Sequence, residues 1–153
     1  MKPSTTALTP LALSLALGLG ACGSSSSGLS RSDLAKQANK ICADGQKQQL
    51  SAGSAPSDFR TNPTAAAAFL DKYVPIIDGV AAKLKGLKPA ANVRDDWNAF
   101  AAKFEQATAF VDSARTKAHN RDKSGIKDIQ QAAALGTATS NAATKVGATT
   151  CAK

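Results

Sequence analysis

Few residues of this 153-residue chain could do acid–base or metal chemistry. It has one histidine, His119, and one glutamate, Glu105, whereas di-metal and haem sites in helical proteins need several inward carboxylates and histidines. No G-x-S-x-G motif accompanies His119 as a hydrolase base. Asp95 and Asp96 are adjacent and would point about 100° apart on a helix. Asp95, Asp96 and His119 are better explained as charges that stabilise helix ends. The sequence therefore predicts no enzyme, no metal site and no cofactor.

The start of the chain carries a more specific signal. Met1 and Lys2 precede an apolar run over residues 11–19, which is shorter than the roughly 20 residues that a membrane-spanning helix needs. A basic start, a short apolar core and small residues after it are typical of an export signal. The run ends in Leu19-Gly20-Ala21-Cys22, which resembles the lipobox of bacterial lipoproteins at all four positions.

The lipobox resemblance implies cleavage after Ala21 and a diacylglyceryl thioether on Cys22, with further acyl chains such as palmitate. Two or three acyl chains anchor a protein durably without a transmembrane segment. Residues 1–21 would be the signal peptide, and residues 22–29 the lipidated Cys22 with a flexible Gly/Ser tether. The expected location is the extracytoplasmic face of the cell membrane. The alternative is ordinary secretion, in which Cys22 remains a plain thiol.

The other two cysteines form an even pair once Cys22 is assigned to lipid. In an oxidising compartment, Cys42 and Cys151 are expected to form a disulfide. On the chain-entropy model, a closed loop of about 100 residues gains up to roughly 4.7 kcal/mol. The alternative is two buried free thiols. The spacing fits neither paired zinc ligands nor a haem-attachment motif.

The length and the net charge of the chain limit the number of domains and the kinds of partner it could bind. Removing the signal peptide leaves 132 residues, enough for one compact domain. The net charge falls from +8 to +7 with the loss of Lys2, and the basic residues are scattered. Weak attraction to anionic lipid headgroups or acidic wall polymers is therefore expected. Nucleic acid is excluded as a partner because of the location and because no nucleic-acid-binding motif is present.

Hydrophobic periodicity predicts that residues 30–153 form an all-α, up-down four-helix bundle. The first helix is capped by Ser30 or Ser32 and fades near Ala52. The second begins at Asn62-Pro63, and Pro75 predicts a kink in it or a break into two shorter helices. The second helix should end at Gly86 to Pro89, the third should run from Val93 to Ala118, and the fourth from about Ile126 to Gly147.

The last two helices are expected to differ in how they pack. Trp97, Phe100 and Phe104 follow the helical period of the third helix and should form the heart of the core. The inner face of the fourth helix is predicted to consist mainly of small residues, among them Ala133, Gly136, Ser140 and Ala143. Small side chains bury little apolar area, at about 25 cal/mol per Å², so the expected disulfide would compensate.

Four short motifs span most of the chain after the signal peptide: the lipobox, residues 38–43, residues 84–89 leading into the Trp97 helix, and Gly147-x-x-x-Cys151. Together they resemble small lipoproteins of high-G+C Gram-positive, actinobacterial type. The resemblance implies anchor, disulfide and bundle, and it brings no activity with it. Ala90 stands where a second proline often follows Pro89 in this group.

Two hypotheses for the function follow. The first is a non-enzymatic envelope module whose surface contacts another envelope protein, an anionic wall polymer or the membrane. The second is a binding protein for a lipid or other small hydrophobic ligand. Its cavity would lie between the small residues of the fourth helix and the aromatic residues Phe69, Tyr73, Phe100 and Phe104.

Overall fold

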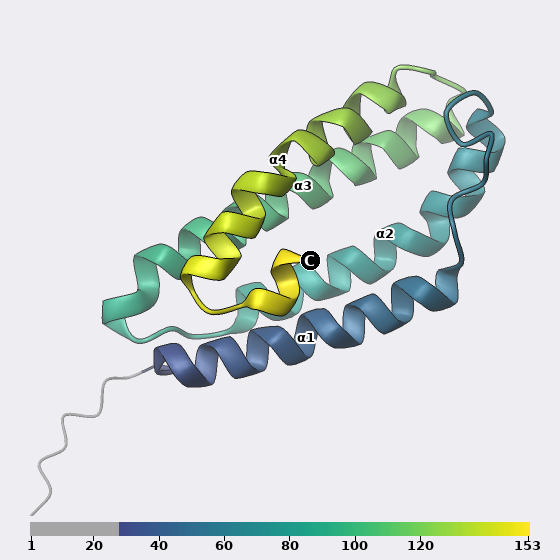
Figure 1. The fold of residues 1–153 in the computed structure, drawn as a ribbon. Coiled ribbons are helices and arrows are strands. Elements are labelled where there is room, and N and C mark those ends of the chain that lie inside the picture. Colours follow the sequence, from purple (N-terminus) through teal and green to yellow (C-terminus); the bar gives the residue numbers. More distant parts are fainter. Residues whose placement is uncertain (1–27) are drawn as a thin grey trace, which may run out of the picture.

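A computed structural model describes residues 28–153 of the chain. The expected signal peptide, the lipobox with Cys22 and residues 23–27 of the expected tether lie outside the described residues. Within residues 28–153 the fold is an all-α four-helix bundle without strands (Figure 1). Its elements are α1 (Arg31–Ala52), α2 (Pro63–Gly86), η1 (Ala91–Val93), α3 (Arg94–His119), α4 (Gly125–Lys145) and η2 (Thr149–Ala152).

Local side-chain caps begin the first two helices. The Ser30 hydroxyl accepts a hydrogen bond from the backbone N–H of Asp33 at 3.2 Å, which settles Ser30 as the cap of α1. The Asn62 side chain accepts bonds from the N–H groups of Thr64 and Ala65 at 3.1 and 3.2 Å. Pro63 occupies the first position of α2, where its missing N–H would have no partner within the helix anyway.

The helix α2 runs without interruption through Pro75, so the expected alternative of two shorter helices is wrong. Pro75 lies on the exposed face of the helix. The carbonyl that loses its helical donor belongs to Asp71, which is also exposed. Water can bond that carbonyl, so the proline costs the helix less than it would on a buried face.

The four helices form an open bundle rather than a closed ring of contacts. In chain order, α1 packs on α2, α2 on α3 and α3 on α4. Between α1 and α4 lies η2, which packs against both helices. Figure 1 shows this carboxyl-terminal segment in yellow, lying between α1 and α4.

The buried residues form two clusters along the bundle. The first is built around Trp97 and Phe100, which are 1% and 0% exposed, and includes Leu34 and Leu84. The second contains Leu70, Val74, Ala66, Ala67, Ala114 and Ala118. The expected core residues Trp97 and Phe100 are confirmed, whereas Phe104 is only half-buried. Phe104 borders a hollow between the two clusters.

The rotation of α4 differs from the expected one. Thr139 and Ala143 are buried, whereas Ala133, which was expected to face inward, is exposed. Ser140 is half-buried and donates a hydrogen bond to the carbonyl of Ala152 in η2 at 2.8 Å. The small residues of α4 differ little in hydrophobicity, so contacts with α3 and η2 decide which of them turn inward.

The predicted disulfide between Cys42 and Cys151 is present, with the two Cα atoms 5.2 Å apart. Side chains of α1 support it. The Asn39 amide donates to the carbonyl of Gly147 at 3.0 Å and accepts from the N–H of Thr150 at 2.7 Å. Gln46 donates to the carbonyl of Thr150 at 2.9 Å. These bonds and the disulfide hold η2 against α1.

Two of the motifs seen in the sequence have a clear structural role at the chain ends. Gly147 has a φ of 83°, a conformation that only glycine adopts without strain, and it turns the chain from α4 into η2. At the other end, the N–H of Leu29 donates to the carbonyl of Lys88 at 2.6 Å, and the N–H of Ala90 donates to the carbonyl of Leu29 at 2.9 Å. The last residue of the expected tether is therefore bonded to the link between α2 and η1.

A part-buried polar cluster joins α3 to the start of α4. The Asp128 carboxylate accepts hydrogen bonds from the Lys117 ammonium at 3.0 Å and from the Ser113 hydroxyl at 2.7 Å. These two bonds, that from Lys117 first, hold the pKa of Asp128 below its ordinary value. A carboxyl group with a depressed pKa in the folded state stabilises the protein above about pH 4, and this contribution is lost as the pH falls further.

We expect Asp128→Asn to lower the free energy of unfolding by about 1–2 kcal/mol at pH 7, because the half-buried ammonium of Lys117 loses its counter-charge. The difference from wild type should shrink as the pH falls below about 4. Urea unfolding at pH 7 and pH 3 measures both effects. Asp44→Asn is the control, since its partner Lys40 is exposed. An undiminished difference at pH 3 would contradict the assignment.

Candidate ligand cavity

A cavity of about 290 Å³, open to solvent beside the exposed residues Gly136 and Lys153, lies between the two buried clusters. On each helix the lining residues recur at three- and four-residue steps, which is the spacing of a single helix face. On α2 these are Tyr73, Ile77 and Val80, and on α3 they are Phe104, Ala107, Thr108 and Val111. On α3 the apolar face that contains the core residues Trp97 and Phe100 continues through these residues, which face a cavity instead of a packed core.

The cavity exists because small residues meet at this level of the bundle. Gly45 of α1, Ala107 of α3, and Ala132 and Gly136 of α4 all line it, and none has a side chain beyond Cβ. Gly45 also brings α1 close to α2, because a Cβ there would collide with Val80.

The structure brings two of the four expected aromatic residues into the cavity wall. Tyr73 and Phe104 line it. Phe100 is completely buried and packs on Trp97, with ring centroids 5.3 Å apart. Phe69 packs beside the cavity and stacks on Tyr73, with ring centroids 5.4 Å apart. Phe100 and Phe69 were misplaced because periodicity identifies an inner face but not which of its residues meet a void.

Tyr73 combines an apolar wall with a polar group. Its ring stacks on Phe69, and its hydroxyl makes no hydrogen bond with any other described residue. Burial raises the pKa of Tyr73 above its ordinary value of 10.0. The phenol is therefore neutral at physiological pH and can both donate and accept a hydrogen bond.

Two threonines line the cavity from facing helices, and they differ in their bonding. The Thr108 hydroxyl donates to the carbonyl of Glu105 at 2.9 Å, an ordinary bond within α3. Thr139 of α4 is 8% exposed, and its hydroxyl has no hydrogen-bond partner. Buried hydroxyls are almost always hydrogen-bonded. Thr139 was not among the expected site residues, and nothing in the sequence distinguishes it from its neighbours on α4.

Near the carboxyl terminus the cavity is lined by the disulfide, Gln46, Gln49 and Lys153. The Gln46 amide is engaged with η2, whereas Lys153 is exposed. None of the residues lining the cavity is acidic, and Lys153 is the one basic residue among them. The arrangement is a mainly apolar space with a few polar groups and at most a positive charge at its edge.

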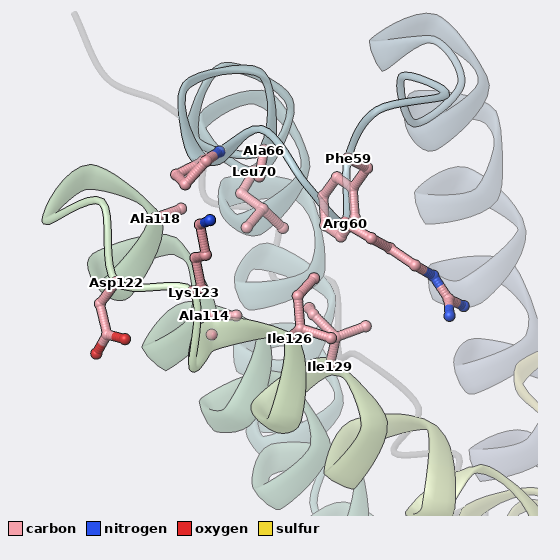
Figure 2. Close-up of a pocket in the computed structure, with 12 residues that line it drawn as sticks. Phe59, Arg60, Ala66, Leu70, Ala114, Ala118, Asp122, Lys123, Ile126 and Ile129 are labelled. Carbon is pink, nitrogen blue, oxygen red and sulfur yellow. The ribbon is translucent and has the colours of Figure 1, made fainter.

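The other hollows of the described chain are less suited to a ligand. Figure 2 shows one at the end of the bundle, where Phe59 and Leu70 face Ile126 and Ile129 while Asp122 points away. It has about 20 Å³, room for about one water molecule. A third hollow of about 300 Å³ lies between residues 55–60 and the start of α4. No buried unpartnered polar group lines it.

The titratable residues singled out in the sequence lie apart from the cavity. His119, in the last turn of α3, pairs with Asp71 across an exposed 2.8 Å contact. Glu105 pairs with Lys85 at 2.8 Å, also exposed. Asp96 lies in the first turn of α3, and hydrogen bonds from Lys145 and then from Arg31 hold its pKa below its ordinary value.

A second carboxylate cluster lies between α2 and α3. Burial, and then the nearby Asp112, raise the pKa of Asp78 above its ordinary value. Asp112 is itself paired with Arg115 at 2.8 Å. Neither carboxylate lines a cavity, so the cluster is an ion-pair network on the surface of the bundle. Within residues 28–153, no group of three or more histidine, cysteine or acidic side chains is placed to hold a metal ion.

Comparisons with family models, with curated proteins and with solved structures find no match to this chain. None of the helices described in residues 28–153 is both long and apolar enough to cross a membrane.

Proposed function

We propose that this protein is a lipid-anchored, extracytoplasmic binding protein that carries a small hydrophobic ligand in the cavity between its four helices. The observation that carries the proposal is the cavity of about 290 Å³, lined mainly by apolar residues. Ligand sites in proteins are typically apolar cavities of about 300–1,000 Å³ with a few polar groups. The cavity is at the lower end of this range, which favours a small ligand over a complete membrane lipid.

The role proposed is non-enzymatic. Catalytic sites gather titratable groups around a cavity, and the groups around this one are two threonines, one tyrosine, two glutamines and an exposed lysine. A ligand bound there would be held, released or passed on rather than converted.

A surface-interaction module is the other function considered, and the described surface gives it less support. Stable interfaces bury about 800 Å² per partner around an apolar centre. Among residues 28–153 the large hydrophobic side chain that stands out as exposed is Leu50, at 82%. A single exposed leucine is ordinary on a soluble surface.

The anchor is proposed from the sequence Leu19-Gly20-Ala21-Cys22. With acyl chains on Cys22, the domain would be held beside the membrane by the residues before Leu29, and a hydrophobic ligand could reach the cavity without crossing much water. Labelling of cells with a palmitate analogue should mark the wild-type protein but not a Cys22→Ala variant. Labelling of both proteins would reject the anchor and leave the cavity proposal intact.

The ligand proposal is tested by filling the cavity. Ala107 lines it, whereas Ala109, two residues further along α3, is exposed and points away. We expect Ala107→Leu to abolish ligand binding because its added carbons occupy the space, and Ala109→Leu to leave it unchanged. Native mass spectrometry of each protein purified from its own host measures the bound mass.

We expect the wild type and Ala109→Leu to show the added mass of a non-covalently bound ligand, and Ala107→Leu to show no added mass. Far-UV circular dichroism verifies that both variants are folded. If the wild-type protein carries no ligand and binds no small hydrophobic molecule on titration, the proposed function is rejected. The same holds if Ala107→Leu is folded and binds as well as wild type.

A further inference from the structure

We propose that the ligand has one oxygen-bearing polar group, and that this group hydrogen-bonds to the hydroxyl of Thr139 while an apolar body fills the rest of the cavity. This inference rests on the proposed ligand-binding function and names the chemical class of the ligand: a small alcohol or carboxylic acid with a medium-length apolar chain.

The hydroxyl of Thr139 lacks the hydrogen bond that a threonine in a helix ordinarily makes. A threonine in a helix ordinarily bonds to a backbone carbonyl three or four residues earlier, as Thr108 does in the same cavity. Thr139 is more than nine-tenths buried and bonds to nothing in the described chain. Leaving a buried hydroxyl without a hydrogen bond is unfavourable. A polar ligand atom that enters the cavity could supply the missing bond to Thr139.

The volume of the cavity limits the size of the ligand. One water molecule occupies about 30 Å³ in the liquid, so a cavity of about 290 Å³ corresponds to roughly ten water molecules. An apolar body of about eight to ten non-hydrogen atoms is of matching size. Tyr73, Ile77 and Phe104 supply the apolar wall against which this body would lie.

The charged side chains around the cavity limit the charge of the ligand. No acidic residue lines it, and the lining residue that carries a charge is Lys153. A cationic ligand would enter a mainly apolar space without a counter-charge, which is strongly unfavourable. The polar group is therefore neutral or anionic, and Lys153 distinguishes the two: it would attract a carboxylate but not an alcohol.

The test compares 1-octanol, octanoate and octane, with free ligand measured by headspace gas chromatography or calorimetry. We expect the wild type to bind octanol at least fivefold more tightly than octane. Thr139→Val keeps the shape and removes the hydroxyl, so it should weaken octanol binding about five- to tenfold and leave octane binding unchanged. Thr139→Ser should retain the preference for octanol. Lys153→Gln should weaken octanoate binding alone.

A stability measurement separates a ligand contact from a structural role. Without ligand, Thr139→Val should unfold at the same urea concentration as wild type or at a higher one, because an unpaired buried hydroxyl is removed. A residue that merely supports the fold would lose stability and binding together.

The outcomes of the binding test are distinct. If octanol, octanoate and octane all fail to bind, the proposed function itself is rejected. If octane binds the wild type as tightly as octanol does, or if Thr139→Val binds octanol unchanged, the cavity binds hydrophobic molecules but the role of Thr139 is overturned.

Discussion

Replacement of both Cys42 and Cys151 by alanine is expected to lower the free energy of unfolding by about 3 kcal/mol, and the melting temperature by about 10 °C. The disulfide joins residues 109 apart in the chain, so its loss frees nearly the whole domain in the unfolded state. In the folded state it fastens η2 between α1 and α4, which otherwise meet through contacts such as the hydrogen bond from Arg31 to the carbonyl of Lys145 at 2.6 Å. Both cysteines also line the cavity, so ligand binding should weaken as well.

Thermal and urea unfolding followed by far-UV circular dichroism measure this loss. Wild-type protein reduced with dithiothreitol should lose the same amount of stability, whereas the reductant should have no effect on the double variant. Mass spectrometry of alkylated protein counts the free thiols in each sample. Equal stability of the oxidised wild type and the double variant would contradict the role assigned to the disulfide.

Phe100→Ala is expected to cost about 4 kcal/mol of unfolding free energy, the largest effect among these substitutions. Phe100 is completely buried and packs edge-on against both Trp97 and Phe104, with ring centroids 5.3 and 6.2 Å apart. Truncation would leave a void in a cluster that already joins α1, α2, α3 and the carboxyl terminus. Domains of this size are stable by about 5–15 kcal/mol in total, so much of the protein would be unfolded at 37 °C.

Phe104→Ala is the matched comparison, one helical turn further along α3. Phe104 is half-buried and borders a space that is already open, so its truncation should cost about 1–2 kcal/mol, well below the cost of a fully packed phenylalanine. It should also enlarge the cavity, so that 1-decanol binds more tightly relative to 1-octanol than in the wild type. Equal losses of stability in the two variants would contradict the distinction between a core and a cavity-lining phenylalanine.

The cavity and the fold impose opposite demands on the same residues. Leucine at position 107 or valine at position 139 would fill space or remove an unpaired hydroxyl, and either change is expected to leave the unliganded fold at least as stable. Sites that bind ligands commonly give up stability in this way. The combination of a lost ligand and a retained or higher unfolding midpoint is therefore the result that most directly supports a binding role.

The sequence by itself determined the helices and the disulfide. The helices follow from local capping bonds, and the disulfide follows from the number of cysteines. Ser30 and Asn62-Pro63 begin their helices through bonds to residues only two or three positions away. The pairing of Cys42 with Cys151 follows once Cys22 is assigned elsewhere, and the pair is present. Trp97 and Phe100 stand out through their size and spacing in a chain with few aromatic residues.

The tertiary structure alone decided which residues of α4 turn inward and where the bundle is hollow. Alanine, glycine, serine and threonine produce little hydrophobic contrast around a helix, so Thr139 rather than Ala133 is buried only because α3 and η2 hold α4 at that rotation. A cavity is likewise a property of several helices at once: Ala107, Ala132 and Gly136 leave space only because they meet at one level of the bundle. The unpaired hydroxyl of Thr139 becomes visible only when every neighbour that could bond to it has been placed.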